Sequence, residues 1–218
     1  MSPRRERRLF AACGVAFVLF ELVGFGLGGS THQLSVSSSA AKIAATLATP
    51  ASPVSWVGAY LDILSFGAFL AFATWACAQL GGGLLGTVGR AMATSYATLS
   101  IASLAVMDTV AYRAGHGLNI QLAQALITTN EALFVGTWFL MAFFLLATGS
   151  LALQESRPLL GWSAIAVALF TLLATALSVT SVGQLSILLF FAWIISASIS
   201  LSRGAHTYQT AAAEPART

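Results

Sequence analysis

The feature that most constrains this chain is a series of apolar runs, each close to twenty residues long and almost free of charge. About twenty consecutive apolar residues form a helix long enough to cross the hydrocarbon core of a bilayer. In lipid the backbone groups must pair within each segment, which favours helices. A transmembrane barrel would need segments of about ten residues with alternating polarity, and these runs are continuous. The sequence therefore predicts an all-α, polytopic transmembrane helix bundle.

Composition indicates the same environment. Of the 218 residues, 57% are hydrophobic and 8% are charged, whereas about a quarter of the residues in an ordinary soluble domain are charged. The net charge is +3, but the basic residues gather at the ends of the apolar runs rather than on one face, which excludes a nucleic-acid interface. We expect the lipid bilayer as the partner and a bacterial plasma membrane as the location.

The apolar runs predict six spans. Pro53 after Ser52 predicts the start of the second span, and Asn130 with Glu131 in the first turn predicts the start of the fourth. The exported loop 30–53 contains AAKIAATLA, which predicts a short amphipathic helix on the membrane surface. A polar tail, 204–218, is expected to be disordered. The expected spans are 9–29, 54–80, 90–113, 131–153, 159–179 and 185–201.

The distribution of basic residues predicts the orientation. With six spans both chain termini share a side, and eight of the ten basic residues fall on that side, against Lys42 and Arg113 on the other. The positive-inside rule then makes both termini cytoplasmic. The first apolar run could instead be a cleaved signal peptide. We interpret it as a retained span, because it is about 20 residues long and contains Glu21.

Four acidic residues fall in the outer half of these spans, each on a different helix. A carboxylate near the bilayer centre costs about 3 kcal/mol, so such groups are expected to face the bundle interior or a wet cavity. Asp62 and Asp108 are expected to approach each other and to share a proton with Glu21 or Arg113 nearby. The candidate ligand or proton site comprises Glu21, Asp62, Asp108, Tyr112, Arg113 and Glu131.

Several of these residues, and the nearby His116, also have a structural explanation. Glu131 can be a first-turn acid favoured by the helix dipole, and Arg113 an interfacial anchor. His116, in a glycine-flanked loop, can simply be solvated. Interhelical hydrogen bonding alone could explain Asp62 and Asp108.

Several catalytic chemistries are not supported. The spans contain no Lys for a Schiff base, no His pair for haem and no HExxH motif, and no glycine-rich phosphate loop is present. We expect no metal and no cofactor, and whether the chain is an enzyme stays open, with a non-enzymatic role favoured. Two membrane aspartates could serve as acid and base, but the glycine-flanked pattern of intramembrane aspartyl proteases is absent.

Three stretches carry a family resemblance: AAKIAATLA, VGAYLDILSF and RPLLGWSAIAVAL. They resemble uncharacterised bacterial membrane proteins, especially actinobacterial ones, of the domain-of-unknown-function type. The resemblance implies six helices and an unassigned activity, and it carries over no functional residue.

Two functions follow as hypotheses. The first is a small carrier or ligand-binding membrane protein with a proton-sharing acidic site open to the outside. The second is a non-enzymatic membrane subunit whose small-residue helices pack against another membrane protein or a second copy of the chain.

Overall fold

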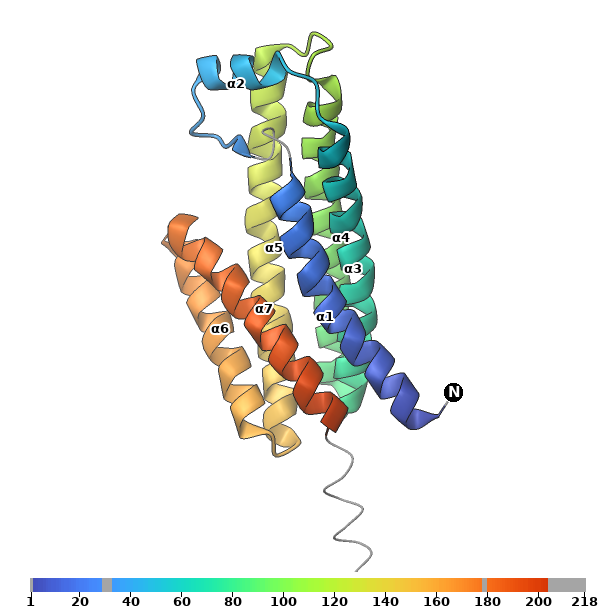
Figure 1. Cartoon of the computed structure of the whole chain (residues 1–218). Helices are drawn as coiled ribbons and strands as arrows, with labels where there is room; N and C mark the ends of the chain where they lie inside the picture. Colours follow the sequence, from blue (N-terminus) through green and yellow to red (C-terminus); the bar gives the residue numbers. More distant parts are fainter. Residues whose placement is uncertain (1, 29–32, 178–179, 204–218) are drawn as a thin grey trace, which may run out of the picture.

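The computed structural model describes residues 2–28, 33–177 and 180–203, and every regular secondary-structure element within these ranges is a helix (Figure 1). The expected all-α class is confirmed. The expected disordered tail, 204–218, lies outside the described residues. The helices are α1 (Pro3–Leu27), α2 (Ala40–Leu47), α3 (Pro53–Gln79), α4 (Gly83–Arg113), α5 (Ile120–Gln154), α6 (Pro158–Ala176) and α7 (Thr180–Arg203).

Five helices of the described chain are long and apolar enough to cross a membrane: α1, α3, α5, α6 and the Leu185–Arg203 part of α7. These five support a membrane protein. The remaining long helix, α4, has 31 residues but is rich in Ala, Ser and Thr, and it is not among the five. The six expected spans are therefore matched by five apolar helices and one long, less apolar helix.

The six long helices run alternately up and down, with short connections between successive helices from α3 onward (Figure 1). The start of α1 and the end of α7 lie at the same end of the bundle, which we call the terminal end. The short helix α2 lies at the opposite end, which we call the α2 end. Helices α6 and α7 stop short of the α2 end, so only α3, α4 and α5 extend to it.

Capping residues explain most helix starts. Proline occupies the first turn of α1, α3 and α6, where its missing N–H costs no hydrogen bond. The Ser52 hydroxyl accepts from the Ser55 N–H at 3.2 Å, which confirms the predicted start of α3. Between α3 and α4, Gly81, Gly82 and Gly83 all have positive φ, a conformation that glycine adopts without strain.

The predicted start of the fourth span is wrong. Helix α5 begins at Ile120, and its cap is Asn119, whose Oδ1 accepts from the Gln121 N–H at 2.7 Å. The amphipathic stretch 118–129 and the apolar run after it form one continuous helix of 35 residues. Asn130 lies inside this helix, and its Oδ1 accepts a 2.7 Å hydrogen bond from the Ser103 hydroxyl of α4. This interhelical bond satisfies the side chain that the sequence suggested as a cap.

Helix α2 packs on protein. Its Ile43 and Leu47 are buried, and they join a small apolar cluster with residues of α4 and α5 near the α2 end. The Gly115 N–H donates to the Leu47 carbonyl at 2.6 Å, and the positive φ of Gly115 brings its backbone against Pro50. The amphipathic helix expected from the sequence is confirmed, with its apolar side covering the α4–α5 hairpin.

A candidate acidic site between α1, α3 and α4

Two glycines bring α1 and α3 into backbone contact. A Cβ placed on Gly58 would lie 2.9 Å from the Gly24 carbonyl oxygen, and a Cβ on Gly24 would lie 3.0 Å from the Gly58 carbonyl oxygen. The same Cβ on Gly24 would overlap the Asp62 carboxyl group, with its Cγ only 2.6 Å away. The Asp62 carboxyl group therefore occupies the space that a side chain at position 24 would need. Asp62 is buried there, with 6% of its surface exposed.

Glu21 and Asp62 meet at this helix crossing. The Ser65 hydroxyl of α3 hydrogen-bonds Oε1 of Glu21 on α1, and it also lies 2.6 Å from the backbone carbonyl oxygen of Asp62. The carboxyl groups of Glu21 and Asp62 are close enough to interact electrostatically. Ser65 is fully buried and Glu21 half-buried. The structure thus brings together two of the predicted residues and adds Ser65.

Helix α4 supplies a tyrosine to the same cluster. The Tyr96 side chain interacts electrostatically with Glu21, and its hydrogen-bond partner is the Ser100 side chain one turn further along α4. Its ring packs edge-on against Phe66 at 5.9 Å and Phe69 at 5.1 Å. Tyr96 therefore has an apolar ring in the bundle core and a polar end beside the acids. We call Glu21, Asp62, Ser65, Tyr96 and Ser100 the acid site.

Asp108 lies closer to the α2 end than Asp62. Ring contacts fix the register of α3 against α4, because Phe69 packs on Tyr96 and Trp56 packs on Tyr112. In that register the α4 position level with Asp62 is near residue 105. Asp108 is then about one helical turn, roughly 5 Å, further along the bundle axis. The approach of the two carboxyl groups stays a prediction.

Glu131 binds a loop. Its Oε2 accepts a 2.9 Å hydrogen bond from the Val36 backbone N–H, which holds the segment between α1 and α2 against α5. Leu34, two residues earlier, is buried in the apolar cluster beneath α2. Glu131 therefore has a structural role in the described fold, and it lies on α5 rather than at the α1–α3 crossing.

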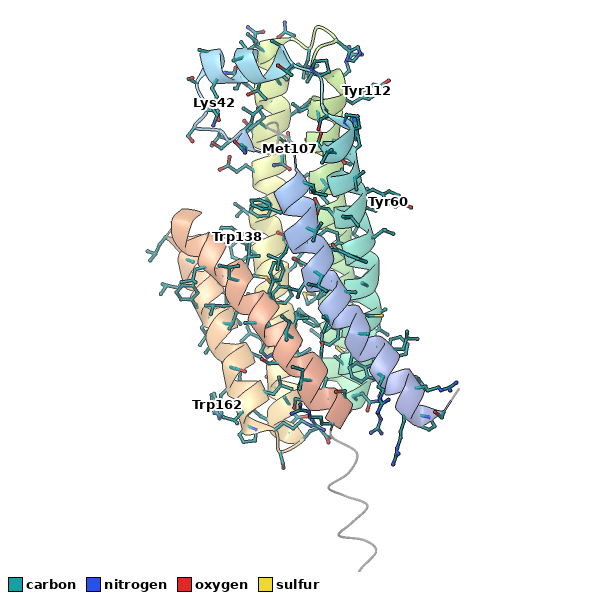
Figure 2. All side chains as sticks on the ribbon, in the orientation of Figure 1. Lys42, Tyr60, Met107, Tyr112, Trp138 and Trp162 are labelled. Atoms are coloured by element: carbon teal, nitrogen blue, oxygen red, sulfur yellow. The ribbon has the colours of Figure 1, made fainter. Side chains whose placement is uncertain are left out.

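Tyr112 and Arg113 lie at the α2 end of α4 and are exposed. The Tyr112 ring stacks on the His116 ring at 6.2 Å and meets the Trp56 ring at 6.5 Å. Figure 2 shows Tyr112 well above Tyr60, toward the α2 end. The structure places Tyr112 in a surface aromatic group and Arg113 at the exposed end of α4, both apart from the Glu21–Ser65 contact.

Sequence reasoning missed Ser65, Tyr96 and Ser100. Serine is frequent in these helices, so nothing in the sequence sets Ser65 apart except its position three residues after Asp62, on the same face. Tyr96 carries a clearer signal, because a tyrosine in mid-span needs a polar partner for its hydroxyl. Among the described residues, no group of three or more His, Cys, Asp or Glu side chains is arranged to hold a metal ion.

The acid site can bind or exchange a positive charge. Two carboxyl groups, two hydroxyls and a phenol on three helices are linked pairwise through Glu21 and Tyr96, and their oxygen atoms are of the kind that bind a proton or a small cation. Comparison of the chain with models of protein families, with curated proteins and with solved structures finds no match.

Proposed function

We propose that all six long helices cross the membrane and that both termini are cytoplasmic. The length and position of α4 favour a membrane-spanning helix, because its 31 residues pack along both α3 and α5. A helix that packs between two membrane spans over this length must cross the membrane with them. The terminal end carries the arginine-rich start of α1 together with Arg157 and Arg203, which supports a cytoplasmic side under the positive-inside rule.

Reporter fusions test this topology. A reporter after Arg157 or Arg203 should report the cytoplasm, and one inserted at Gly117 should report the outside. An external signal at Arg157 would contradict the six-span arrangement.

We propose that the chain is a small carrier or cation-binding protein of the plasma membrane, using the acid site in exchange for a proton. The observation that carries this proposal is the Glu21–Ser65 contact beside Asp62. Two neighbouring carboxylates in a low-dielectric site cannot easily both be charged, so one of them favours a proton or a bound cation.

The geometry of Ser65 supports the same proposal. A hydroxyl has one proton and two lone pairs. Its two close partners are Glu21 Oε1 and the Asp62 carbonyl oxygen at 2.6 Å, and a single proton cannot serve both acceptors fully. A protonated Glu21 removes the conflict, because Glu21 then donates to Ser65 while Ser65 donates to the carbonyl. When a cation replaces that proton, the same oxygens become its ligands.

Infrared spectroscopy of the protein in lipid vesicles tests this function. We expect a carboxylic C=O band near neutral pH that disappears in Glu21→Gln and is retained in the matched control Glu6→Gln, at the exposed start of the same helix. Addition of sodium, potassium or tetramethylammonium ions should reduce the band for the ion that binds. If the band is the same in both Glu21→Gln and Asp62→Asn, the acid site holds no exchangeable proton.

A specific observation favours a second function, that of a membrane subunit that packs against a partner. No large hydrophobic side chain of α4 is exposed between Val88 and Tyr112, whereas the other long helices expose several Leu, Val, Ile or Phe side chains. The exposed positions of α4 in this stretch are Ala91, Thr94, Ser95, Thr98, Ala102, Ala105 and Thr109. Small residues on a lipid-facing surface let another helix approach closely.

The two functions give different results. Glu21→Gln should remove proton exchange in a carrier and leave any complex intact. Ala102→Leu, on the exposed face of α4, should dissociate a complex and leave the infrared band unchanged. Chemical crosslinking in native membranes followed by mass measurement gives the second readout.

A further inference from the structure

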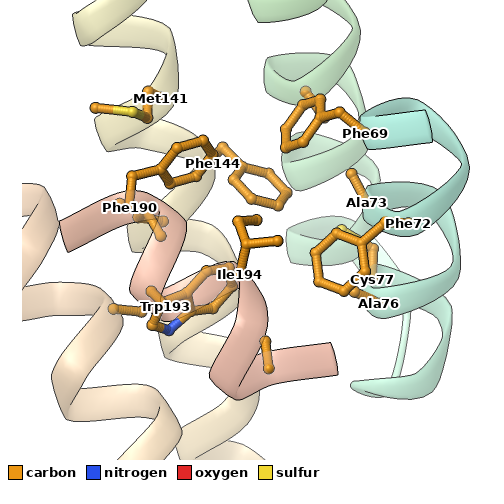
Figure 3. Packing of buried hydrophobic residues seen from close by; sticks show 14 of the residues in the cluster. Phe69, Phe72, Ala73, Ala76, Cys77, Met141, Phe144, Phe190, Trp193 and Ile194 are labelled. Atoms are coloured by element: carbon orange, nitrogen blue, oxygen red, sulfur yellow. The ribbon is translucent and has the colours of Figure 1, made fainter. Parts of the chain in front are cut away.

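Phe190 of α7 belongs to the buried aromatic core, where it lies beside Phe144 (Figure 3). Phe190 packs against Phe17 of α1 at 6.1 Å, Phe69 of α3 at 6.0 Å, Tyr96 of α4 at 5.9 Å and Phe144 of α5 at 6.5 Å. The four phenylalanines among these five residues are fully buried. Five helices therefore meet around a single side chain. We call these five rings the aromatic layer.

The aromatic layer adjoins the acid site on its terminal-end side. Phe17 lies one turn before Glu21 on α1, and Phe69 lies one turn after Ser65 on α3. Tyr96 belongs to both groups, since its ring is in the layer and it interacts electrostatically with Glu21. A proton or cation at the acid site is thus separated from the terminal end by this layer.

Beyond the aromatic layer the core stays apolar and closely packed. Phe72, Ala73, Ala76 and Ile194 follow toward the terminal end, and all four are 0% exposed. A closely packed apolar segment of this kind excludes water and blocks ions, and ions can pass it only when its side chains move apart.

We propose that Phe190 is the gate between the acid site and the terminal end of the bundle. The proposal rests on the proposed carrier function and names the element that would control it. Helix α7 packs mainly on α1 and α6, whereas α3, α4 and α5 pack on one another. A shift of α7 therefore withdraws Phe190 from four rings at once, while the helices that carry three of those rings keep their mutual contacts.

Cysteine accessibility tests the gate in the full-length protein in lipid vesicles. With Cys13 and Cys77 replaced by Ala, single cysteines are introduced at Ser100, in the acid site, or at Ala73, beyond the layer. A membrane-impermeant, cationic methanethiosulfonate reagent is added on the α2 side only. We expect modification at position 100 and protection at position 73. Combining Ala73→Cys with Phe190→Ala should raise its modification rate by roughly a factor of ten.

The matched control is Phe191→Ala, the next residue of α7, whose ring packs on Phe17 at 5.6 Å and on Phe190 at 6.3 Å. This variant removes an equal volume and should leave position 73 protected. Phe190→Leu serves as the test variant if Phe190→Ala does not fold, as judged by size-exclusion chromatography and thermal unfolding.

The possible outcomes distinguish failure of the Phe190 gate from failure of the proposed carrier function. Modification at position 100 together with protection at position 73 in a folded Phe190 variant overturns the gate alone. Equal modification at position 73 in the Phe190 and Phe191 variants also overturns it, because loosened packing would then explain the access. Protection at position 100 from the α2 side overturns the outward-facing acid site, and the gate with it.

Discussion

Replacing Gly24 by alanine should separate α1 from α3 at the acid site. The added methyl group would overlap the Asp62 carboxyl group and lie 3.0 Å from the Gly58 carbonyl oxygen. The carbonyl oxygen belongs to the backbone of a long helix and cannot move by itself, and the carboxyl group is buried. The two helices must therefore move apart, or Asp62 must leave its position.

Two terms set the size of the effect on the free energy of unfolding. Overfilling a closely packed site costs about 1–3 kcal/mol. Alanine in place of glycine in a helix stabilises it by about 1 kcal/mol, which offsets part of that cost. A control for the second term is Gly67→Ala, in the middle of α3, where an added Cβ meets nothing within 4 Å. The difference between the two variants isolates the helix contact and should be about 1–3 kcal/mol.

The measurement is reversible unfolding in mixed detergent micelles, followed by circular dichroism at increasing denaturing detergent. Gly67→Ala should unfold at the same or a slightly higher denaturant fraction than the parent protein, and Gly24→Ala at a lower one. Gly58→Ala, which meets the Gly24 carbonyl oxygen at 2.9 Å, should behave like Gly24→Ala. If Gly24→Ala and Gly67→Ala differ by less than about 0.5 kcal/mol, α1 and α3 do not contact each other in this way.

Three further predictions concern single hydrogen bonds. Ser65→Ala removes the hydroxyl that bonds Glu21, and because a buried carboxyl loses its partner the free energy of unfolding should fall by about 1–3 kcal/mol in the same titration. For Ser103 and Asn130, a double-mutant cycle with alanine at each position should give a coupling energy of about 0.6 kcal/mol, and a value of zero would mean that the α4–α5 bond does not form. Glu131→Ala should release the loop before α2, so limited proteolysis from the α2 side should cut near Val36 faster than in Glu131→Gln, which keeps an acceptor oxygen.

The sequence predicted the fold class well because the length and apolarity of its hydrophobic runs determine that class. Lipid excludes unpaired backbone, so each long apolar run had to be a helix. The Ser52–Pro53 pair also located a helix start correctly, since a cap acts within one turn. Asn130 shows where local reasoning fails, because the side chain that could cap a helix instead bonds Ser103 of the neighbouring helix.

The acid site was predictable only in part. Buried carboxylates are costly in lipid, so Glu21 and Asp62 stood out by their positions within the apolar runs. Their partner Ser65 did not, because it is one of many serines and its role depends on the register between α1 and α3. Glu131 was singled out by the same cost argument, yet it bonds the loop before α2. The charged residues within the apolar runs are therefore candidates for the site, and the register between the helices determines which of these residues contact one another.

The unbroken course of α5 past Asn130 has a mechanical consequence. At 1.5 Å per residue, its 35 residues measure about 52 Å, whereas the hydrocarbon core is about 30 Å thick. Together with α4 it forms a two-helix unit that carries α2 at the α2 end and Tyr96 and Phe144 in the aromatic layer. A binder that tilts this unit at its α2 end, such as an antibody against α2, would therefore displace both rings without contacting them.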